Sequence, residues 1–462
     1  MAVLNPSLRL AIRPSDAPFR SSNPRALSPP FALIRLLPIP STHALISISS
    51  PTVSRVSELN PPSERFLPFP IQVEPPLPPE KARFHRELEA AVDIVQRACR
   101  LCIDVKKSLL SGDRRILEKD DRTPVTIADF GVQALISLEL NRLFPSIPLV
   151  AEEDSGFLRS NSVEPIDGEG YDGDFLVEAI LNAVGDKASG SDPLTSDDVL
   201  EAIDRGGKDA NSFDAEPATY WVLDPIDGTR GFLRGSDALY VVGLALIVKG
   251  EIALGVMGCP NWKNYPLSVE NNKNSKIVAS EGGIIMVAHA GCGTWKKKFS
   301  PVIGNYRGTL DIWQRCFVDN SSLVHEARFC IPDSQSWEFM PLSALFSSTI
   351  DDAECRDEKV VLLMPTCCGS LCKYLMVASG RASVFILRTR AQTVIKVWDH
   401  AVGVICVNEA GGQVSDWSGN QLDFAADTIG RRIIFPSGGV LVTNGKLHGE
   451  LTEMISSNSS VV

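Results

Sequence analysis

An apolar run that ends in two closely spaced carboxylates constrains this chain more than any other feature. Residues 220–223 (Tyr-Trp-Val-Leu) predict a buried strand, and residues 224–229 (Asp-Pro-Ile-Asp-Gly-Thr) follow it directly as a turn. A strand end on a rigid sheet can hold such a turn in a fixed direction. Two carboxylates and a hydroxyl in one short segment suit a hard cation such as Mg²⁺, which prefers oxygen ligands. The segment therefore predicts a site for phosphate chemistry.

Asp-Gly is also an ordinary turn signal, so the motif needs support elsewhere in the chain. A near copy at residues 165–169 (Pro-Ile-Asp-Gly-Glu) lacks the leading Asp and the trailing Thr, and we expect it to be a loop. Support comes from residues 149–154 (Leu-Val-Ala-Glu-Glu-Asp) and 398–401 (Trp-Asp-His-Ala), where acids again end apolar runs. These two further acidic segments favour a functional site over an isolated turn.

The composition is typical of a globular enzyme. The chain has 462 residues, 44% hydrophobic and 22% charged, so we expect two lobes with appendages. A net charge of −11 argues against nucleic-acid binding by a basic face. The chain contains no run of about 18 apolar residues, so no membrane span is predicted. An acidic protein that handles phosphates needs metal ions to supply positive charge at its site.

The first 75 residues differ from the rest. Residues 1–57 carry six arginines, many serines and prolines, no lysine, and Asp16 as their one acid. Such composition is typical of a mitochondrial or chloroplast transit peptide, with a merely disordered tail as the alternative. Residues 61–79 add eight prolines, which favour an extended linker. We therefore assign residues 1–75 to a transit peptide and Pro-rich linker that direct the protein to the mitochondrion or, alternatively, the chloroplast.

Two long helices are predicted first, over residues 81–110 and 127–144. Cys99 and Cys102 continue the apolar stripe of the first helix, so we expect them in the core and not on a metal. Between the helices, Pro124 disfavours helix at the preceding residue. The polar loop there leaves Asp121 free to point into a site.

The predicted division has two lobes. The amino-terminal lobe spans residues 76–285 and includes an insertion at 157–219, which is either a solvated loop or a lid, with short helices near 175–184 and 196–203. Residues 238–257 predict an antiparallel hairpin. The carboxy-terminal lobe spans residues 286–455. The predicted strands and helices of that lobe are 360–364, 370–379, 383–387 and 400–410, and residues 456–462 are a disordered tail.

Four segments, in order, resemble the lithium-sensitive, Mg²⁺-dependent phosphatase superfamily that includes inositol monophosphatases and 3′(2′),5′-bisphosphate nucleotidases. They are residues 121–129 (DRTPVTIAD), 151–156 (AEEDSG), 224–229, and 398–401 leading into 409–412 (EAGG). The resemblance covers roughly residues 80–450 and is strongest to the nucleotidase branch, in particular to the plant phosphoadenosine-phosphate phosphatases. It implies an α+β fold, a two-lobe αβαβα layered sandwich of the inositol monophosphatase and fructose-1,6-bisphosphatase type.

The resemblance also implies a metal centre of two or three Mg²⁺ ions. Its ligands would be the side chains of Glu152, Asp224, Asp227 and Asp399 and the backbone carbonyl of Ile226. Two divalent ions roughly 3.5–4 Å apart can activate a water, neutralise the phosphoryl oxygens and stabilise the leaving alkoxide.

Two residues are implied to orient and deprotonate the attacking water, Asp121 and Thr229. A threonine hydroxyl is a weak base, so a relay through Thr229 to Asp121 is the expected chemistry. The alternative is that each merely caps a turn or a helix.

Substrate contacts are implied at residues 369–373 (GSLCK), where Ser370 and Lys373 share one face of a predicted helix. Thr229 and Asp399 complete the implied substrate-binding set, together with Arg388. In the nucleotidase branch an Arg stands at a strand end shortly before Trp-Asp-His, and here Arg388 comes about one residue late. Either a small gap restores its contact or the substrate differs.

The resemblance thus implies a phosphatase that removes the 3′(2′)-phosphate of adenosine 3′,5′-bisphosphate to give AMP, with 3′-phosphoadenosine 5′-phosphosulfate (PAPS) as a further candidate substrate. The expected partner is this small molecule, with no nucleic acid, no membrane and no obligate protein partner. An inositol mono- or polyphosphate phosphatase is the nearest alternative, because it would share every metal ligand. A catalytically silent regulatory protein of the same fold is the other.

Overall fold

The computed structural model describes residues 83–458 apart from eleven internal segments. These are 111–116, 119–123, 161–172, 191–192, 214–217, 235–237, 264–281, 300–311, 352–356, 365–368 and 390–392. The predicted transit peptide and linker, the near copy of the acidic motif at 165–169, and Asp121 therefore lie outside the described residues.

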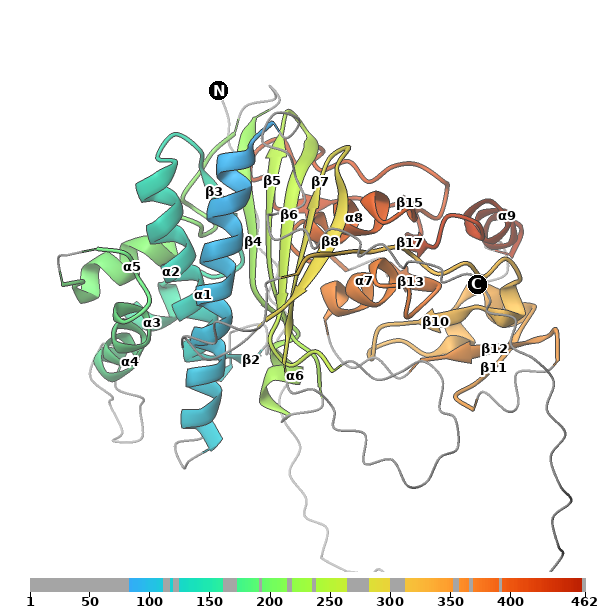
Figure 1. Cartoon of the computed structure of the whole chain (residues 1–462), viewed down its shortest axis with the longest axis horizontal. Coiled ribbons are helices and arrows are strands. Elements are labelled where there is room, and N and C mark those ends of the chain that lie inside the picture. Colours follow the sequence, from blue (N-terminus) through green and yellow to red (C-terminus); the bar gives the residue numbers. More distant parts are fainter. Residues whose placement is uncertain are drawn as a thin grey trace, which may run out of the picture. The chain divides into compact units, whose positions relative to one another are not determined.

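Two long helices, α1 (His85–Leu110) and α2 (Ile127–Leu143), cover one face of a seven-stranded sheet, as Figure 1 shows. Cys99 and Cys102 are buried in the core beneath α1, as predicted. Thr126 begins α2 by accepting hydrogen bonds from the backbone N–H groups of Ala128 and Asp129, and the Asp129 side chain accepts one from the Thr126 N–H. This capping box fixes where the helix starts.

The seven-stranded sheet has the order β3-β4-β5-β6-β7-β8-β9, with β3 and β4 parallel and every other pair antiparallel. The strands are β3 (Leu149–Ala151), β4 (Thr219–Asp227), β5 (Val241–Val248), β6 (Glu251–Cys259), β7 (Ile284–His289), β8 (Gly293–Lys298) and β9 (Gln314–Arg315). Strand β4 is buried on both faces: Trp221 packs toward the α1–α2 core and Val222 into the core on the other face. This explains why its sequence reads as a continuous apolar run.

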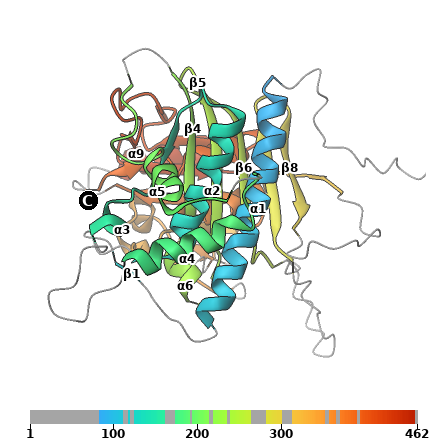
Figure 2. The same cartoon turned by 90° about the vertical axis from the view of Figure 1, so that its left-hand side faces the viewer.

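The described parts of the segment predicted as an exposed insertion pack against the protein. It contains α3 (Gly156–Ser160), α4 (Gly173–Gly185) and α5 (Ser196–Asp204), close to the helices predicted there, and Figure 2 shows them beside α1 and α2. Ile180 of α4 and Val199 of α5 are fully buried in the α1–α2 core. Helices α4 and α5 are therefore part of the core and not of a solvated loop, because each has an apolar face that α2 covers.

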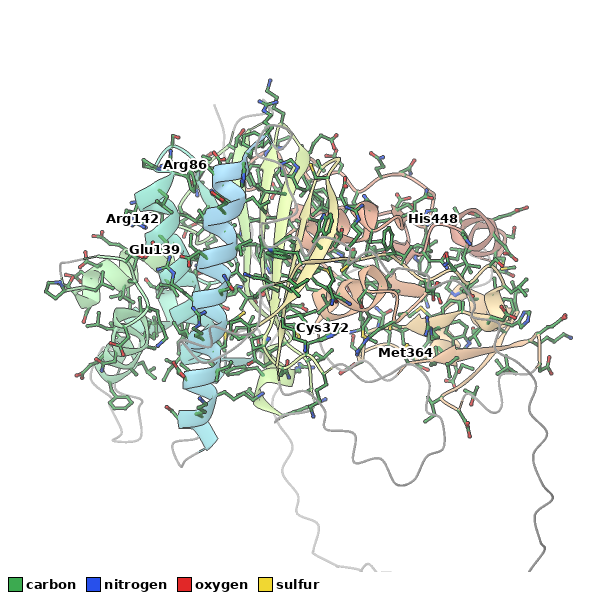
Figure 3. All side chains as sticks on the ribbon, viewed as in Figure 1. Arg86, Glu139, Arg142, Met364, Cys372 and His448 are labelled. Atoms are coloured by element: carbon green, nitrogen blue, oxygen red, sulfur yellow. The ribbon has the colours of Figure 1, made fainter. Side chains whose placement is uncertain are left out.

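A buried carboxylate holds this helical layer together. Glu139 of α2 is 1% exposed and accepts hydrogen bonds from Arg97 of α1 at 3.0 Å, Arg142 at 2.8 Å and the backbone N–H of Ser189. Glu139 and Arg142 are labelled in Figure 3. Burial alone would raise the pKa of Glu139, but these three partners outweigh it and hold the pKa at about 2.

The second sheet has the order β11-β12-β10-β13-β17-β15. Its strands are β11 (Ser347–Thr349), β12 (Val360–Leu363), β10 (Arg328–Cys330), β13 (Val384–Arg388), β17 (Gly439–Thr443) and β15 (Gln413–Asp416). Helices α7 (Ser370–Ala378) and α8 (Ala401–Glu409) pack between the two sheets, and α9 (His448–Asn458) covers the outer face of the second (Figure 1). The layers are thus α, β, α, β, α, which is the predicted fold class.

Short elements complete the described structure. They are β1 (Leu117–Glu118), β2 (Pro124–Val125), α6 (Thr229–Leu233), β14 (Ile395–Lys396), β16 (Ile433–Ile434) and the 3₁₀ turns Val324–Glu326, Trp337–Phe339 and Pro341–Ala344. No helix in the described part of the chain has the length and apolar character needed to cross a membrane.

Two predicted boundaries differ from the structure. Residue 285 lies inside β7, and the first sheet continues to Arg315, so the change of sheet falls between Arg315 and Arg328. Strands β7, β8 and β9 continue the first sheet after the β5–β6 hairpin, and no sequence pattern distinguishes them from strands of a second sheet. The predicted tail from 456 is also too long, because α9 continues to Asn458 and buries Ile455.

Candidate active site

The acidic motif continues strand β4 and does not follow it as a turn. The pairing of β4 with β5 shifts register between Asp224 and Asp227, which marks a bulge around Pro225. Proline has no N–H for the ladder and is tolerated at bulges, which re-aim neighbouring side chains. The turn comes afterwards, at Gly228, whose φ of 90° is a conformation that favours glycine.

Three carboxylates meet beside this bulge. One oxygen from each of Asp224, Asp227 and Asp399 lies within 4.8 Å of the others. Asp399 comes from a different layer, between β14 and the first residue of α8. Burial raises the pKa of both Asp224 and Asp399 well above the ordinary value, and the charge of Glu152 adds to both shifts. The structure therefore brings all four predicted carboxylate ligands into one region.

The cluster has the properties of a cation site. Oδ1 of Asp224 is buried and has no hydrogen-bond partner among the described residues. An unpaired buried carboxylate oxygen is costly, and a hard divalent cation would satisfy it. A set of carboxylates with a nearby backbone carbonyl, that of Ile226, matches the oxygen ligands that Mg²⁺ prefers. The residues present thus fit the predicted metal.

Asp227 has a different environment from Asp224, because its carboxylate faces the amino-terminal end of α7. Cys372, labelled in Figure 3, donates its backbone N–H to Asp227 Oδ2 at 3.2 Å. Burial raises the pKa of Asp227 to about 6, against the lowering effects of Lys373 and of the backbone N–H groups of Cys372, Ser370 and Leu371. Helix α7 therefore carries positive partial charge to the acidic cluster.

Gly369 makes this approach possible. A Cβ atom at this position would stand 1.9 Å from Asp227 Oδ2, far inside contact distance. Any larger residue would push the carboxylate away from the first turn of α7. The glycine before Ser370 is thus required by the close contact between strand β4 and helix α7.

Lys373, predicted as a substrate contact, lies near Asp227 but is more deeply placed than a surface lysine. It is 2% exposed, and its Nζ donates to the Gly369 carbonyl at 3.1 Å. Ser370, the first residue of α7, is half-buried. Both residues lie at the end of α7 that faces Asp227.

Thr229 lies beside Asp129, a carboxylate that was not among the predicted site residues. Its Oγ1 is 3.2 Å from Asp129 Oδ1, to which it can donate, and also 3.2 Å from the Ile226 carbonyl. Asp129 is buried, and its Oδ2 accepts hydrogen bonds from the backbone and hydroxyl of Thr126. Asp129 therefore lies beside Thr229 at hydrogen-bonding distance, whereas Asp121, which was predicted for that place, lies outside the described residues.

A local signal for Asp129 was present. Thr126 and Asp129 are spaced as in a capping box, within the segment that carried the family resemblance. The long-range contact with Thr229 joins two layers of the fold and leaves no trace in the sequence.

The structure does not bring Arg388 to the acidic cluster. Its Nη1 donates to the Phe339 carbonyl at 2.9 Å, and its backbone N–H donates to Gln335 Oε1 at 3.0 Å. Ile386, two residues earlier on β13, packs in the core beneath α9, whereas Phe385 packs against Tyr374 of α7. Because side chains alternate along a strand, a displacement of one residue puts Arg388 on the face opposite α7.

Comparison with known proteins identifies a single family. A model described as the inositol monophosphatase family matches residues 174–460. A protein of Arabidopsis thaliana with the provisional name of a mitochondrial 3′(2′),5′-bisphosphate nucleotidase is 56% identical over 405 residues, 87% of this chain and 94% of that protein. The 3′(2′),5′-bisphosphate nucleotidase of Oryza sativa is 33% identical over 380 residues, 80% of this chain and 93% of that protein.

The solved structures that are similar to this chain are more distant in sequence. The IMPase of Thermotoga maritima is 18% identical, with a TM-score of 0.45, and covers 81% of this chain and 98% of its own. CysQ of Bacteroides thetaiotaomicron, described as a bacterial member of the inositol monophosphatase family, is 18% identical with a TM-score of 0.43 and covers 78% and 97%.

Proposed function

This chain belongs to the inositol monophosphatase family, and on that premise we propose that it hydrolyses the 3′(2′)-phosphate of adenosine 3′,5′-bisphosphate to give AMP and phosphate. The observation that carries the proposal is the cluster of Asp224, Asp227 and Asp399 with its unpaired buried oxygen. The names of the similar plant proteins support the bisphosphate nucleotide as substrate. PAPS, which also has a 3′-phosphate, is a further candidate.

The proposed reaction depends on divalent cations, with Mg²⁺ as the expected ion. Glu152, Asp224, Asp227 and Asp399 would hold two or three such ions, with the Ile226 carbonyl as a further ligand. When bound, the ions supply positive charge for the phosphate oxygens and lower the pKa of water. The buried, mutually repelling acids favour this assignment, because a silent protein would gain nothing from retaining them.

The chain's own residues supply a path for the proton of the attacking water. A water that lies against Thr229 Oγ1 can pass its proton to this oxygen while the hydroxyl proton moves to Asp129 Oδ1, 3.2 Å away. Thr126 fixes the Asp129 carboxylate through its other oxygen, so the acceptor is held in place. We therefore propose Asp129 as the proton acceptor and Thr229 as the relay; Asp121, predicted for the acceptor role, lies outside the described residues.

The substrate would lie against the first turn of α7. Ser370 offers a hydroxyl there, and Lys373 offers a positive charge to a phosphate. Thr229 and Asp399 would line the same space. Arg388 is absent from this proposed set, because its guanidinium is held on the Phe339 carbonyl.

A phosphate-release assay with the full chain tests this function. The substrates are adenosine 3′,5′-bisphosphate, PAPS and inositol 1-phosphate, each with Mg²⁺ and with a chelator. We expect the highest kcat/KM for adenosine 3′,5′-bisphosphate and no turnover without divalent cations. A higher kcat/KM for inositol 1-phosphate would replace the nucleotidase assignment, and the absence of turnover on all three would favour the regulatory alternative.

We also propose a mitochondrial location, supported by the transit-like composition of residues 1–75 and the name of the Arabidopsis relative. A fluorescent protein fused behind residues 1–75 should enter mitochondria. Import into chloroplasts would select the alternative organelle, and a diffuse cytosolic signal would reject the transit peptide.

A further inference from the structure

Arg432, in the loop before β16, binds the backbone at the end of β3. Its Nη2 donates to the Ala151 carbonyl at 2.6 Å, and its Nη1 donates to the Gly206 carbonyl at 3.2 Å. The Ala151 N–H also donates to Gly206, at 2.9 Å. One guanidinium from the second half of the chain therefore closes a hydrogen-bonded unit that immediately precedes Glu152.

The other side of Glu152 is held as well. Gln133 of α2 accepts a hydrogen bond from the Glu153 N–H at 2.9 Å and donates Nε2 to the Glu153 carbonyl at 2.5 Å. Glu152 is thus flanked by two residues whose backbone groups are bound by side chains from other elements. A backbone held on both sides leaves the Glu152 carboxylate fewer positions than an ordinary loop would allow.

Arg432 also contacts the segment that carries Asp399. Its Cζ lies 4.8 Å from the ring centroid of Trp398, the residue before Asp399, and Trp398 is 4% exposed. The Arg432 carbonyl accepts a hydrogen bond from the Val397 N–H at 2.9 Å. Both the side chain and the backbone of Arg432 are therefore bound to the segment leading into α8.

These contacts join two different layers of the fold. Glu152 follows a strand of the first sheet, whereas Asp399 precedes a helix of the middle layer, and neither lies on β4. Arg432 spans the two with a planar guanidinium that bonds carbonyls at its edge and stacks on an aromatic ring with its face. Lysine can reproduce the charge and the stacking, but it cannot form both carbonyl contacts with the same geometry.

We propose that Arg432 is a positioning residue that sets the separation of Glu152 and Asp399 and thereby tunes the affinity of the acidic cluster for divalent cations. The proposal rests on the metal-dependent function proposed above. Arg432 acts through the Ala151 carbonyl and the Trp398 ring, and its charge also interacts with that of Glu152. It takes no part in the chemistry, and a lysine in its place keeps the charge, so Arg432→Lys isolates the positional effect. Residues that orient metal ligands in this way commonly change metal affinity by about 10- to 100-fold when they are replaced.

The test is calorimetric titration of the metal-free full chain with Mg²⁺, on the wild type, Arg432→Lys and Arg432→Met. We expect the Kd for Mg²⁺ to rise about 10- to 100-fold in Arg432→Met and by an intermediate factor in Arg432→Lys. Because Arg432 does not touch the reacting atoms, kcat at saturating Mg²⁺ should remain close to that of the wild type.

Arg381 provides a matched control. Its Cζ lies 4.4 Å from the Trp262 ring centroid, and its Nη1 donates to the Lys263 carbonyl at 2.8 Å, so it combines the same two kinds of contact. Arg381→Met should lower the thermal midpoint to a similar degree without changing the Kd for Mg²⁺. An unchanged Kd in both Arg432 variants would overturn the proposal and leave Arg432 a structural residue.

The remaining outcomes also support or overturn the positioning role of Arg432. Should Arg432→Met fail to fold, Arg432→Lys still tests this role, because lysine retains the charge and the stacking. An unaltered Kd for Mg²⁺ in the lysine variant would then overturn the proposal. Should the wild type bind no Mg²⁺ at all, the proposed function fails first and the positioning role fails with it. Weakened binding with unimpaired saturating kcat supports both.

Discussion

Replacing Asp224 with asparagine should stabilise the metal-free protein and remove its response to Mg²⁺. Oδ1 of Asp224 is buried without a partner among the described residues, and burial and the neighbouring acids raise its pKa. At pH 7.5 the metal-free folded state must therefore either keep a repelled charge or take up a proton. Keeping the charge and taking up a proton each lower the free energy of unfolding. Asparagine, which is uncharged, avoids both costs.

The pH sets an upper limit on the size of the effect. Protonating a carboxyl group of ordinary pKa 3.8 at pH 7.5 costs at most about 5 kcal/mol, at about 1.36 kcal/mol per unit. The buried amide of asparagine would itself lack some hydrogen-bond partners, which reduces this stabilisation by about 1–3 kcal/mol. The net gain is therefore at most about 4 kcal/mol. With an unfolding entropy of roughly 2.1 cal/mol/K per residue over about 380 residues, the midpoint should rise by at most about 5 °C.

The pH dependence has a definite sign. A folded-state pKa above the unfolded one leaves stability intact at low pH and removes it as pH rises. The difference in stability between metal-free Asp224→Asn and the metal-free wild type should therefore be small near pH 4 and grow as the pH rises. Saturating Mg²⁺ at 100 times its Kd should stabilise the wild type by about 2.7 kcal/mol and the variant by much less.

The assay is thermal unfolding of the chelator-treated full chain, with and without Mg²⁺. Asp416→Asn is the control, because Asp416 is also buried but accepts hydrogen bonds from Ser418, Asn420 and Ser437. This control should lose stability and keep the Mg²⁺ response. A metal-free Asp224→Asn protein less stable than the wild type, or one that Mg²⁺ stabilises as strongly, would refute the reasoning.

Three other variants test separate parts of the account. Thr229→Val should lower kcat by about 10²–10⁴-fold because it removes the relay to Asp129, whereas Thr229→Ser should retain most activity; equal rates for valine and wild type would exclude the relay. Glu139 has a pKa of about 2 against an ordinary 4.5, so it contributes about 3 kcal/mol that is present above pH 4.5 and lost as the pH falls toward 2. Denaturant unfolding should show that Glu139→Gln lacks this acid-sensitive stability, and identical pH profiles would contradict it. Lys373→Ala should reduce kcat/KM for adenosine 3′,5′-bisphosphate relative to inositol 1-phosphate by roughly 10- to 150-fold, and equal losses would place Lys373 in general folding or at the reacting phosphate.

Local patterns predicted the elements that carry the site. The apolar run of β4, the hairpin of β5 and β6, and helices α7 and α8 have clear periodicity and clear ends, such as Gly380 with its positive φ after α7. The family resemblance then grouped Glu152, Asp224, Asp227 and Asp399, which come from three different parts of the chain. The structure brings these four together because the carboxyl ends of β3 and β4 meet the segment that leads into α8.

Contacts between distant segments could not be predicted in the same way. Asp129 shows only its capping role in the sequence, and its hydrogen bond to Thr229 depends on how α2 packs against β4. The carbonyl contact of Arg432 with Ala151 joins segments 281 residues apart. The displacement of Arg388 was visible, but its consequence required the strand pairing that fixes which face the side chain occupies.

The proposed hydrolysis can be followed by ³¹P NMR of adenosine 3′,5′-bisphosphate in the presence of the full chain and Mg²⁺. We expect the 3′-phosphate resonance to disappear and inorganic phosphate to appear at the same rate, while the 5′-phosphate resonance persists as AMP. Release of the 5′-phosphate, or an unchanged spectrum under conditions in which inositol 1-phosphate is hydrolysed, would contradict it.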